Sequence, residues 1–178
     1  MPLKNNALTT LAAVKSYLKI TSDTDNSLLE DLINASSNAI ERYCERTFKE
    51  QLFTDEEYDG NGLNGLYLRQ YPVKSITSVT VEGTSLNIID YKCKKNNGKL
   101  IRNNGIWPTG EINILVTYTA GYTEIPSDLE LACKHLVMSY FKSDIASFST
   151  TFQDGFVFRP EALPAQVKAL VAPYKKVM

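Results

Sequence analysis

The sequence contains few of the side chains on which most enzymes and metal sites depend. Its 178 residues include three cysteines, Cys44, Cys93 and Cys133, and a single histidine, His135. The cysteines are far apart and form no C-x-x-C pair, so we expect reduced, structural thiols rather than a disulfide framework or a zinc knuckle. One imidazole without a nucleophile in a recognisable pattern provides neither a catalytic triad nor a histidine metal site. The composition therefore predicts a protein without catalysis, metal or cofactor.

The sequence also lacks long apolar runs and an excess of charge. No run approaches the ~20 apolar residues that span a bilayer, so we expect no membrane segment. The first six residues do not resemble a secretory signal, so we expect synthesis in a cytoplasm. Nineteen basic and twenty acidic residues give a net charge of -1. This balance excludes a global attraction to nucleic acid, because phosphate binding needs a concentrated positive surface.

The hydrophobic periodicity changes at two places along the chain. Residues 1–50 and 123–178 repeat apolar residues at intervals of three and four, which is typical of amphipathic helices. Residues 51–122 instead contain short alternating runs between Gly- and Asn-rich turns, typical of antiparallel strands. Strands are expected over 66–69, 73–81, 86–91, 99–102 and 112–118. The sequence predicts an α+β fold, with 1–50 and 123–178 forming one discontinuous helical bundle and 51–122 an inserted antiparallel β block.

Two short motifs in the middle of the chain have weak functional interpretations. Residues 60–65 match G-x-G-x-x-G, but a strand and Pro72 follow where a dinucleotide site needs a helix, so a glycine-rich turn is favoured. Asp55, Glu57 and Asp59 resemble the start of a calcium loop, yet Leu66 stands where a bidentate glutamate is required. We expect a solvated acidic turn. A metal-dependent hydrolase that uses these carboxylates is the alternative, and it predicts thermal stabilisation by metal.

A basic cluster surrounds the turn expected within 91–102. It consists of Lys92, Lys94, Lys95, Lys99 and Arg102. The cluster could contact phosphates, but only Tyr91 offers a nearby stacking ring, so a solvated loop is the default interpretation. The alternative function for the whole chain is a small monomeric nucleic-acid-binding protein that uses this hairpin, and salt-sensitive DNA binding by a monomer would favour it.

Residues 145–160 are the most unusual stretch and predict an apolar hairpin or arm. Asp154 and Gly155 favour a two-residue turn, which makes both faces of the hairpin apolar. Burying one phenylalanine contributes about 1.5–3 kcal/mol, so some surface must cover these rings. We predict that a neighbouring subunit covers them, so that the hairpin forms a subunit interface. The alternative is that helices of the same chain cover both faces. The predicted interface residues are Phe148, Phe152, Phe156, Val157 and Phe158.

Several segments along the chain are informative through their order and spacing. They are 7–15, 39–48, 68–73 leading into 76–79, 116–122, 125–129 and Leu163-Pro164 with Val167, Leu170 and Tyr174. Together these segments, from about Leu8 to Tyr174, resemble the head–tail connector proteins of tailed bacteriophages and prophages, also called adaptor or head-completion proteins.

The resemblance implies a structural virion protein that forms a ring at the head–tail junction, expected to be a dodecamer. Such a ring docks on the portal protein after DNA packaging and extends the DNA channel. The other implied partners are a stopper or tail-completion protein and DNA that passes without sequence recognition. The resemblance assigns portal docking to Tyr174, Lys175 and Lys176. It also implies synthesis in the cytoplasm of a bacterial host.

Overall fold

The computed structural model describes residues 2–149 and 163–176 and confirms the α+β fold class. The chain divides into two compact units. One comprises Met1–Phe48 with Glu124–Met178, and the other comprises Lys49–Thr123. The first is called the helical unit below and the second the β unit. Within the described ranges, no helix is long and apolar enough to cross a membrane.

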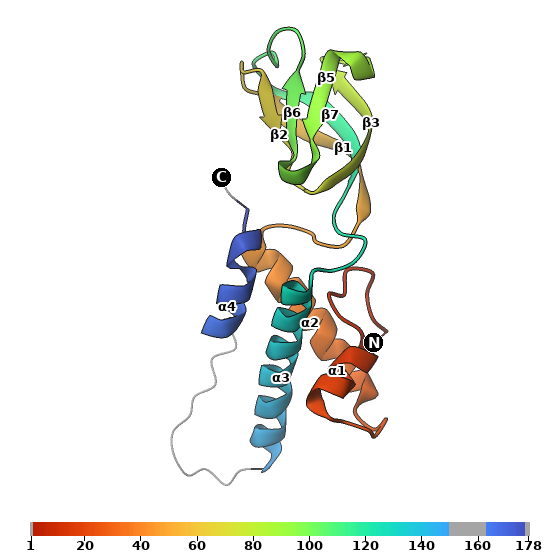
Figure 1. Cartoon of the computed structure of the whole chain (residues 1–178), viewed down its shortest axis with the longest axis vertical. Helices are drawn as coiled ribbons and strands as arrows, with labels where there is room; N and C mark the ends of the chain where they lie inside the picture. The colour runs from red at the N-terminus through yellow and green to blue at the C-terminus, as the bar shows by residue number, and fades with distance from the viewer. Residues whose placement is uncertain (1, 150–162, 177–178) are drawn as a thin grey trace. The chain divides into compact units, whose positions relative to one another are not determined.

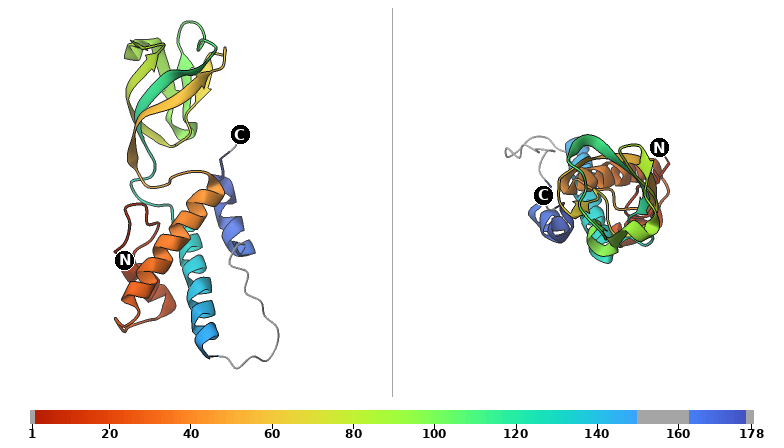
Figure 2. Two further views of the ribbon diagram at one scale, coloured as in Figure 1. Left: turned by 180° about the vertical axis from the view of Figure 1, so that it is seen from behind. Right: turned by 90° about the horizontal axis from the view of Figure 1, so that it is seen from above.

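Among its described residues, the helical unit has four α-helices and one 3-10 turn. They are α1 (Leu11–Leu18), α2 (Asn26–Cys44), α3 (Ser127–Ser149), α4 (Ala165–Val171) and η3 (Ala172–Tyr174). Helices α2 and α3 lie side by side, and α4 packs against α3 (Figure 1 and Figure 2). Apolar residues at intervals of three and four form its core, as the periodicity predicts. The buried side chains include Val14, Leu29, Ile33, Ile40, Cys44, Phe48, Leu129, Cys133, Leu136, Val137, Val167 and Val171.

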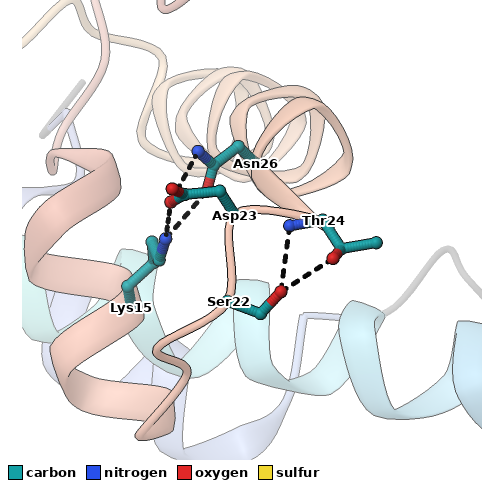
Figure 3. Close-up of polar contacts among 5 residues, drawn as sticks. All are labelled: Lys15, Ser22, Asp23, Thr24 and Asn26. Atoms are coloured by element: carbon teal, nitrogen blue, oxygen red, sulfur yellow. Dashed lines mark hydrogen bonds and ion pairs between the residues drawn. The ribbon is translucent and has the colours of Figure 1, made fainter.

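Polar side chains fix the connection between α1 and α2. Thr10 caps α1, because its hydroxyl accepts a hydrogen bond from the Ala13 amide at 3.2 Å. Lys15 Nζ lies 2.6 Å from Asp23 Oδ1 and donates to Asn26 Oδ1 at 2.9 Å (Figure 3). Asn26 Nδ2 in turn donates to Asp23 Oδ1 at 3.1 Å. This triangle joins the middle of α1 to the start of α2.

The β unit contains seven strands in two antiparallel sheets. The strands are β1 (Gln51–Gly60), β2 (Gly65–Tyr67), β3 (Val73–Val81), β4 (Thr84–Ser85), β5 (Tyr91–Lys94), β6 (Lys99–Arg102) and β7 (Gly110–Ala120). The larger sheet has the order β1-β7-β3-β4, and the smaller one has the order β2-β6-β5. The inner faces of both sheets share one core around Trp107, which is fully buried.

Two parts of the β unit differ from the strand pattern expected from the sequence. The sequence pattern does not predict strand β1, because its acidic residues hide the alternation and its partner β7 lies some sixty residues away. The pattern predicts a strand over 86–91, yet Ile88–Asp90 form the 3-10 turn η1. The Asn87 side chain accepts from the Ile89 amide, and the Asp90 carboxylate accepts from the Asn87 amide. This capping box ends the extended chain before β5 begins.

Candidate functional site

The predicted apolar arm falls mostly outside the described residues. Helix α3 continues to Ser149, so residues 145–149 are helical and not the first strand of a hairpin. Extending an existing helix fixes only one residue for each hydrogen bond gained, and no Gly or Pro interrupts it here. Phe148 belongs to this last part of α3. Phe152, Phe156, Val157 and Phe158 lie outside the described residues, and their role as an interface stays a prediction.

Tyr174, one of the predicted portal-docking residues, is held by the helical unit itself. Its hydroxyl donates to both carboxylate oxygens of Asp128, each at 2.7 Å. Its ring packs edge-on against Phe48, with the centroids 5.9 Å apart. Its carbonyl oxygen accepts from Arg46 Nη1 at 3.0 Å. The side chain is therefore occupied within its own unit and acts here as an anchor for the C-terminal segment.

Lys175 and Lys176 directly follow Tyr174 in the chain. Both contact the C-terminal end of α2. The Lys175 ammonium lies 5.1 Å from the centroid of the Tyr43 ring, in a cation–π contact. The Lys176 amide donates to the Cys44 carbonyl at 3.0 Å, which satisfies one of the free carbonyls at the helix end. Positive charge near a helix C-terminus is also favourable because of the helix dipole. The backbone of Lys175 and Lys176 thus has a defined position within the helical unit.

Arg46 and Asp128 are essential to this arrangement, and the sequence does not identify either role. Arg46 is only 4% exposed, and its guanidinium lies 5.5 Å from the centroid of the Phe48 ring. In the sequence, Arg46 stands among charged residues, a pattern typical of a solvent-exposed helix end. A buried arginine cannot be distinguished there by local pattern, because its partner Tyr174 is 128 residues away.

The thiols and the histidine occupy structural positions. Burial raises the pKa of Cys44 to about 11, although Arg46 and Lys175 lower it in part. Burial raises the pKa of Cys133 to about 12. Both are therefore protonated and poorly nucleophilic at neutral pH. The His135 ring packs against the edge of Tyr17, with the centroids 5.8 Å apart.

The acidic residues of β1 hold irregular backbone in place. The Asp55 carboxylate accepts from the Thr117 hydroxyl at 2.8 Å, and Asp59 Oδ1 accepts from the Ile112 amide at 2.7 Å. Glu57 is exposed. Across residues 2–149 and 163–176, no three His, Cys, Asp or Glu side chains lie close enough together to hold a metal ion. The segment is a strand rather than the predicted acidic turn.

The glycine-rich stretch 60–65 is explained by close packing. A Cβ at Gly60 would lie 1.6 Å from the Pro108 carbonyl oxygen, and Gly62 has a φ of +70°. Asn61 supports the loop by donating to the Gly65 carbonyl at 3.0 Å. The stretch connects two strands, β1 and β2, and a turn is the structure that the sequence favours there.

The basic cluster lies on β5, η2 (Lys95–Asn97) and β6, and its members have different neighbours. Lys99 Nζ lies 5.2 Å from the centroid of the Tyr67 ring, and the Arg102 guanidinium lies 5.5 Å from the Trp107 ring. Tyr91, the ring that the sequence places beside the lysines, is buried in the core. Tyr67, from a strand more than thirty residues away from Lys99, is the exposed ring instead.

Comparisons with known proteins give the context for this fold. A family model described as "head completion protein" matches residues 7–177. A chain from the neck of an empty GTA particle, computed with C6 symmetry, has a TM-score of 0.63 at 16% identity, covering 100% of this chain and 94% of that one. A chain from the neck of a native GTA particle, computed with C12 symmetry, has a TM-score of 0.60 at 16% identity, covering 100% of this chain and 93% of that one.

A chain from the virion of a native gene transfer agent (GTA) particle has a TM-score of 0.61 at 16% identity and covers 100% of this chain and 94% of that one. At this identity, the three structures show a shared fold. No curated protein sequence matches the chain. The family match extends over nearly the whole sequence and confirms the resemblance found there. The chain belongs to the head completion protein family, and it is a structural virion protein of the head–tail junction rather than an enzyme.

Proposed function

We propose that the chain forms a ring at the head–tail junction, docks on the portal protein after DNA packaging, and extends the channel through which DNA leaves. The observation that carries this proposal is the fold shared over the full length of the chain with neck chains of particles computed with C6 and C12 symmetry. Those symmetries favour a ring of twelve copies. In a ring, each subunit uses two different surfaces for its two neighbours, and rotation closes the assembly.

The C-terminal anchor supports the docking part of the proposal. Tyr174 is fastened to Asp128 and Arg46, so Lys175 and Lys176, which follow it, start from a defined point on the helical unit. Lys175 is exposed and Lys176 half-buried beside it. These two lysines provide positive charge at that point, and we expect them to contact acidic groups on the portal protein. A pre-positioned segment loses less conformational entropy on binding than a free one.

The apolar arm supports the ring part of the proposal. In a ring, Phe152, Phe156 and Phe158 would be covered by a neighbouring copy, because their apolar area is costly to leave in water. Phe148, at the end of α3, and Val157 would complete this interface. A stopper or tail-completion protein would bind the ring on the side away from the portal, and DNA would pass through the ring without sequence recognition.

Co-assembly with the cognate portal protein, imaged by electron microscopy, tests the ring. The test variant is Phe152→Asp with Phe156→Asp. The matched control is Leu52→Asp with Ile112→Asp, which also replaces two apolar residues by two acids at positions 58% and 59% exposed. We expect rings from the wild type and the control but not from the arm variant. Complete rings from the arm variant would show that the arm is not the interface.

Portal docking needs a separate pair of variants. Lys175→Glu with Lys176→Glu should weaken attachment of the ring to the portal, whereas Lys4→Glu with Lys168→Glu makes the same change in net charge on other parts of the helical unit. Equal attachment of both variants would contradict the docking assignment. A chain that stays monomeric with the portal protein and binds DNA in a salt-sensitive way would instead support the alternative, a small nucleic-acid-binding protein that uses the hairpin 91–102.

A further inference from the structure

One face of the three-stranded sheet carries positive charge without compensating acid. In the antiparallel register, Lys94 lies opposite Lys99, and Lys99 lies opposite Tyr67. Lys92 lies opposite Ile101, two residues along the same strands. Cross-strand partners share a face of a sheet, and alternate residues along a strand point to opposite faces. We call this solvent-facing side the basic sheet face, and its residues are Gly65, Tyr67, Lys92, Lys94, Lys99 and Ile101.

The opposite side of the same sheet forms part of the core. Tyr91, Leu66 and Leu100 alternate with the residues of the basic sheet face, and all three are buried. Lys92 and Lys94 are exposed, and Lys99 is half-buried. This alternation fixes the direction of the three lysines, because turning the strands over would place ammonium groups in the core and expose the apolar side chains.

The pairing of Lys94 with Lys99 is unfavourable for stability. Like charges directly opposite each other destabilise an antiparallel pair. In the described part of the chain, none of the three lysines on this face forms an ion pair with a carboxylate. The β unit nevertheless has as many acidic as basic residues, eight of each, and Asp55, Glu57 and Asp59 lie on β1 of the other sheet. Five of the eight acidic residues lie on β1 and β7, whereas five of the eight basic residues lie on β5, η2 and β6.

Two further features extend the positive surface. A Cβ at Gly65 would lie 2.4 Å from Lys99 Cε, so the glycine leaves room for the Lys99 side chain to lie across β2 toward Tyr67. Tyr67 is 58% exposed and presents a ring beside this ammonium. At the turn between β5 and β6, Lys95 Nζ donates to the Lys74 carbonyl at 2.8 Å. This bond places the Lys95 side chain, at the turn end of the three-stranded sheet, beside the backbone of Lys74 on β3 of the four-stranded sheet.

We infer that the basic sheet face is a contact surface for the phosphate backbone of duplex DNA. Phosphates supply the negative charge that the face lacks, and lysines contact them as point charges without reading bases. Three such contacts give weak binding that salt reduces further, which lets DNA move past the surface. The place of this contact in the particle rests on the proposed function, but DNA binding by the free chain is a separate measurement.

Fluorescence anisotropy with a labelled 30-base-pair duplex of random sequence tests the inference. The wild type should bind with an affinity that falls steeply as salt rises. Lys92→Gln with Lys94→Gln should reduce affinity about tenfold at low salt, and the slope of log affinity against log salt should become shallower by about 2, because each phosphate contact contributes about 0.9. Lys142→Gln with Lys168→Gln changes the net charge equally on exposed residues of the helical unit and should bind as the wild type does.

A second variant separates lost binding from lost folding. Lys94→Glu creates an opposite-charge pair with Lys99, so its melting temperature should equal or exceed that of the wild type while DNA binding falls. No duplex binding by the wild type, or an equal loss in the helical-unit control, would overturn the inference. Tighter binding to an RNA of the same length would overturn the assignment to DNA. Rings that form normally with the lysine variants would leave the proposed ring intact whatever the binding result.

Discussion

Tyr174 and Asp128 are 46 residues apart in the sequence, and the phenol of one donates to both carboxylate oxygens of the other at 2.7 Å. Asp128 Oδ1 also accepts from the Leu129 amide at 3.0 Å, near the start of α3. The 3-10 turn η3 is thereby fastened to the first turn of α3. This contact makes the C-terminal segment part of the helical unit. It also fixes the position of the backbone from which Lys175 and Lys176 follow.

Tyr174→Phe should weaken this attachment without removing the ring contact with Phe48. A hydrogen bond to a charged group contributes about 1.5–3 kcal/mol when buried, and Tyr174 is half-buried, so we expect a loss of about 1–2 kcal/mol in the free energy of unfolding. Urea denaturation followed by circular dichroism measures it. Tyr17→Phe, at an exposed tyrosine, is the control. Equal stability of both variants would mean that the bond to Asp128 contributes nothing measurable.

Tyr118→Phe should destabilise the β unit through the partly buried carboxylate of Glu56. Glu56 accepts from the hydroxyl groups of Tyr58 and Tyr118, and the Tyr118 bond is 2.5 Å long. Burial, and secondly Glu56, raise the pKa of both tyrosines, so both stay protonated donors. Removing one donor leaves the carboxylate less satisfied and should cost about 1–3 kcal/mol. The control Tyr67→Phe, at an exposed ring, should change the unfolding midpoint little. A larger loss of stability from Tyr67→Phe than from Tyr118→Phe would contradict this role for Tyr118.

Gly60→Ala should be poorly tolerated, because the new methyl group would overlap the Pro108 carbonyl, 1.6 Å from the Cβ position. Backbone must move to accept it, so we expect a loss of about 3 kcal/mol or more and a lower melting temperature. Gly83→Asn is the matched control. Nothing lies within 4 Å of its Cβ position, and asparagine tolerates the φ of +77° better than most residues. A Gly60 variant as stable as the Gly83 variant would show that this turn relaxes easily.

Glu130→Gln should lower stability at neutral pH and have no effect in acid. The hydrogen bond from Lys134 lowers the pKa of Glu130, with a smaller contribution from Thr9. A carboxyl group whose folded pKa is depressed stabilises the fold above its unfolded pKa, and this stabilisation is lost as the pH falls through the folded pKa. We expect a difference of about 0.3–0.5 kcal/mol at pH 7. Denaturation at several pH values from 3 to 7 measures this difference in the free energy of unfolding. The exposed substitution Glu124→Gln is the control. A difference between Glu130→Gln and the wild type that persists at pH 3 would contradict the pairing of Glu130 with Lys134.

Helix positions could be predicted because their signals are local. Ile33 and Ile40 on α2, and Leu129 and Leu136 on α3, are fully or almost fully buried, as the spacing of apolar residues indicates. Pro164 lies at the N-cap of α4, where its missing amide leaves no helical hydrogen bond unmade. Glu130 shows the limit of such signals. Its carboxylate contacts Thr9 and Lys134, and Thr9 is 121 residues away.

The candidate site depended on contacts that local pattern does not encode. The sequence identified the lysines of 91–102 as a cluster, but it paired them with Tyr91, which is buried, rather than with Tyr67. Only the register of β2 against β6 puts Tyr67 opposite Lys99. Likewise, Tyr174 could be singled out only by resemblance, and its actual partners Asp128 and Arg46 had no assigned role.

The sequence by itself determined the α+β class, the family, and the helical stripes of α2 and α3, because periodicity and proline each act within a few residues. The tertiary structure alone decided that β1 pairs with β7, that Lys94 faces Lys99, and that Tyr174 meets Asp128. These contacts join residues whose proximity depends on strand register and on packing of the whole unit. Any single local pattern is compatible with many such arrangements, and the shared core selects one of them.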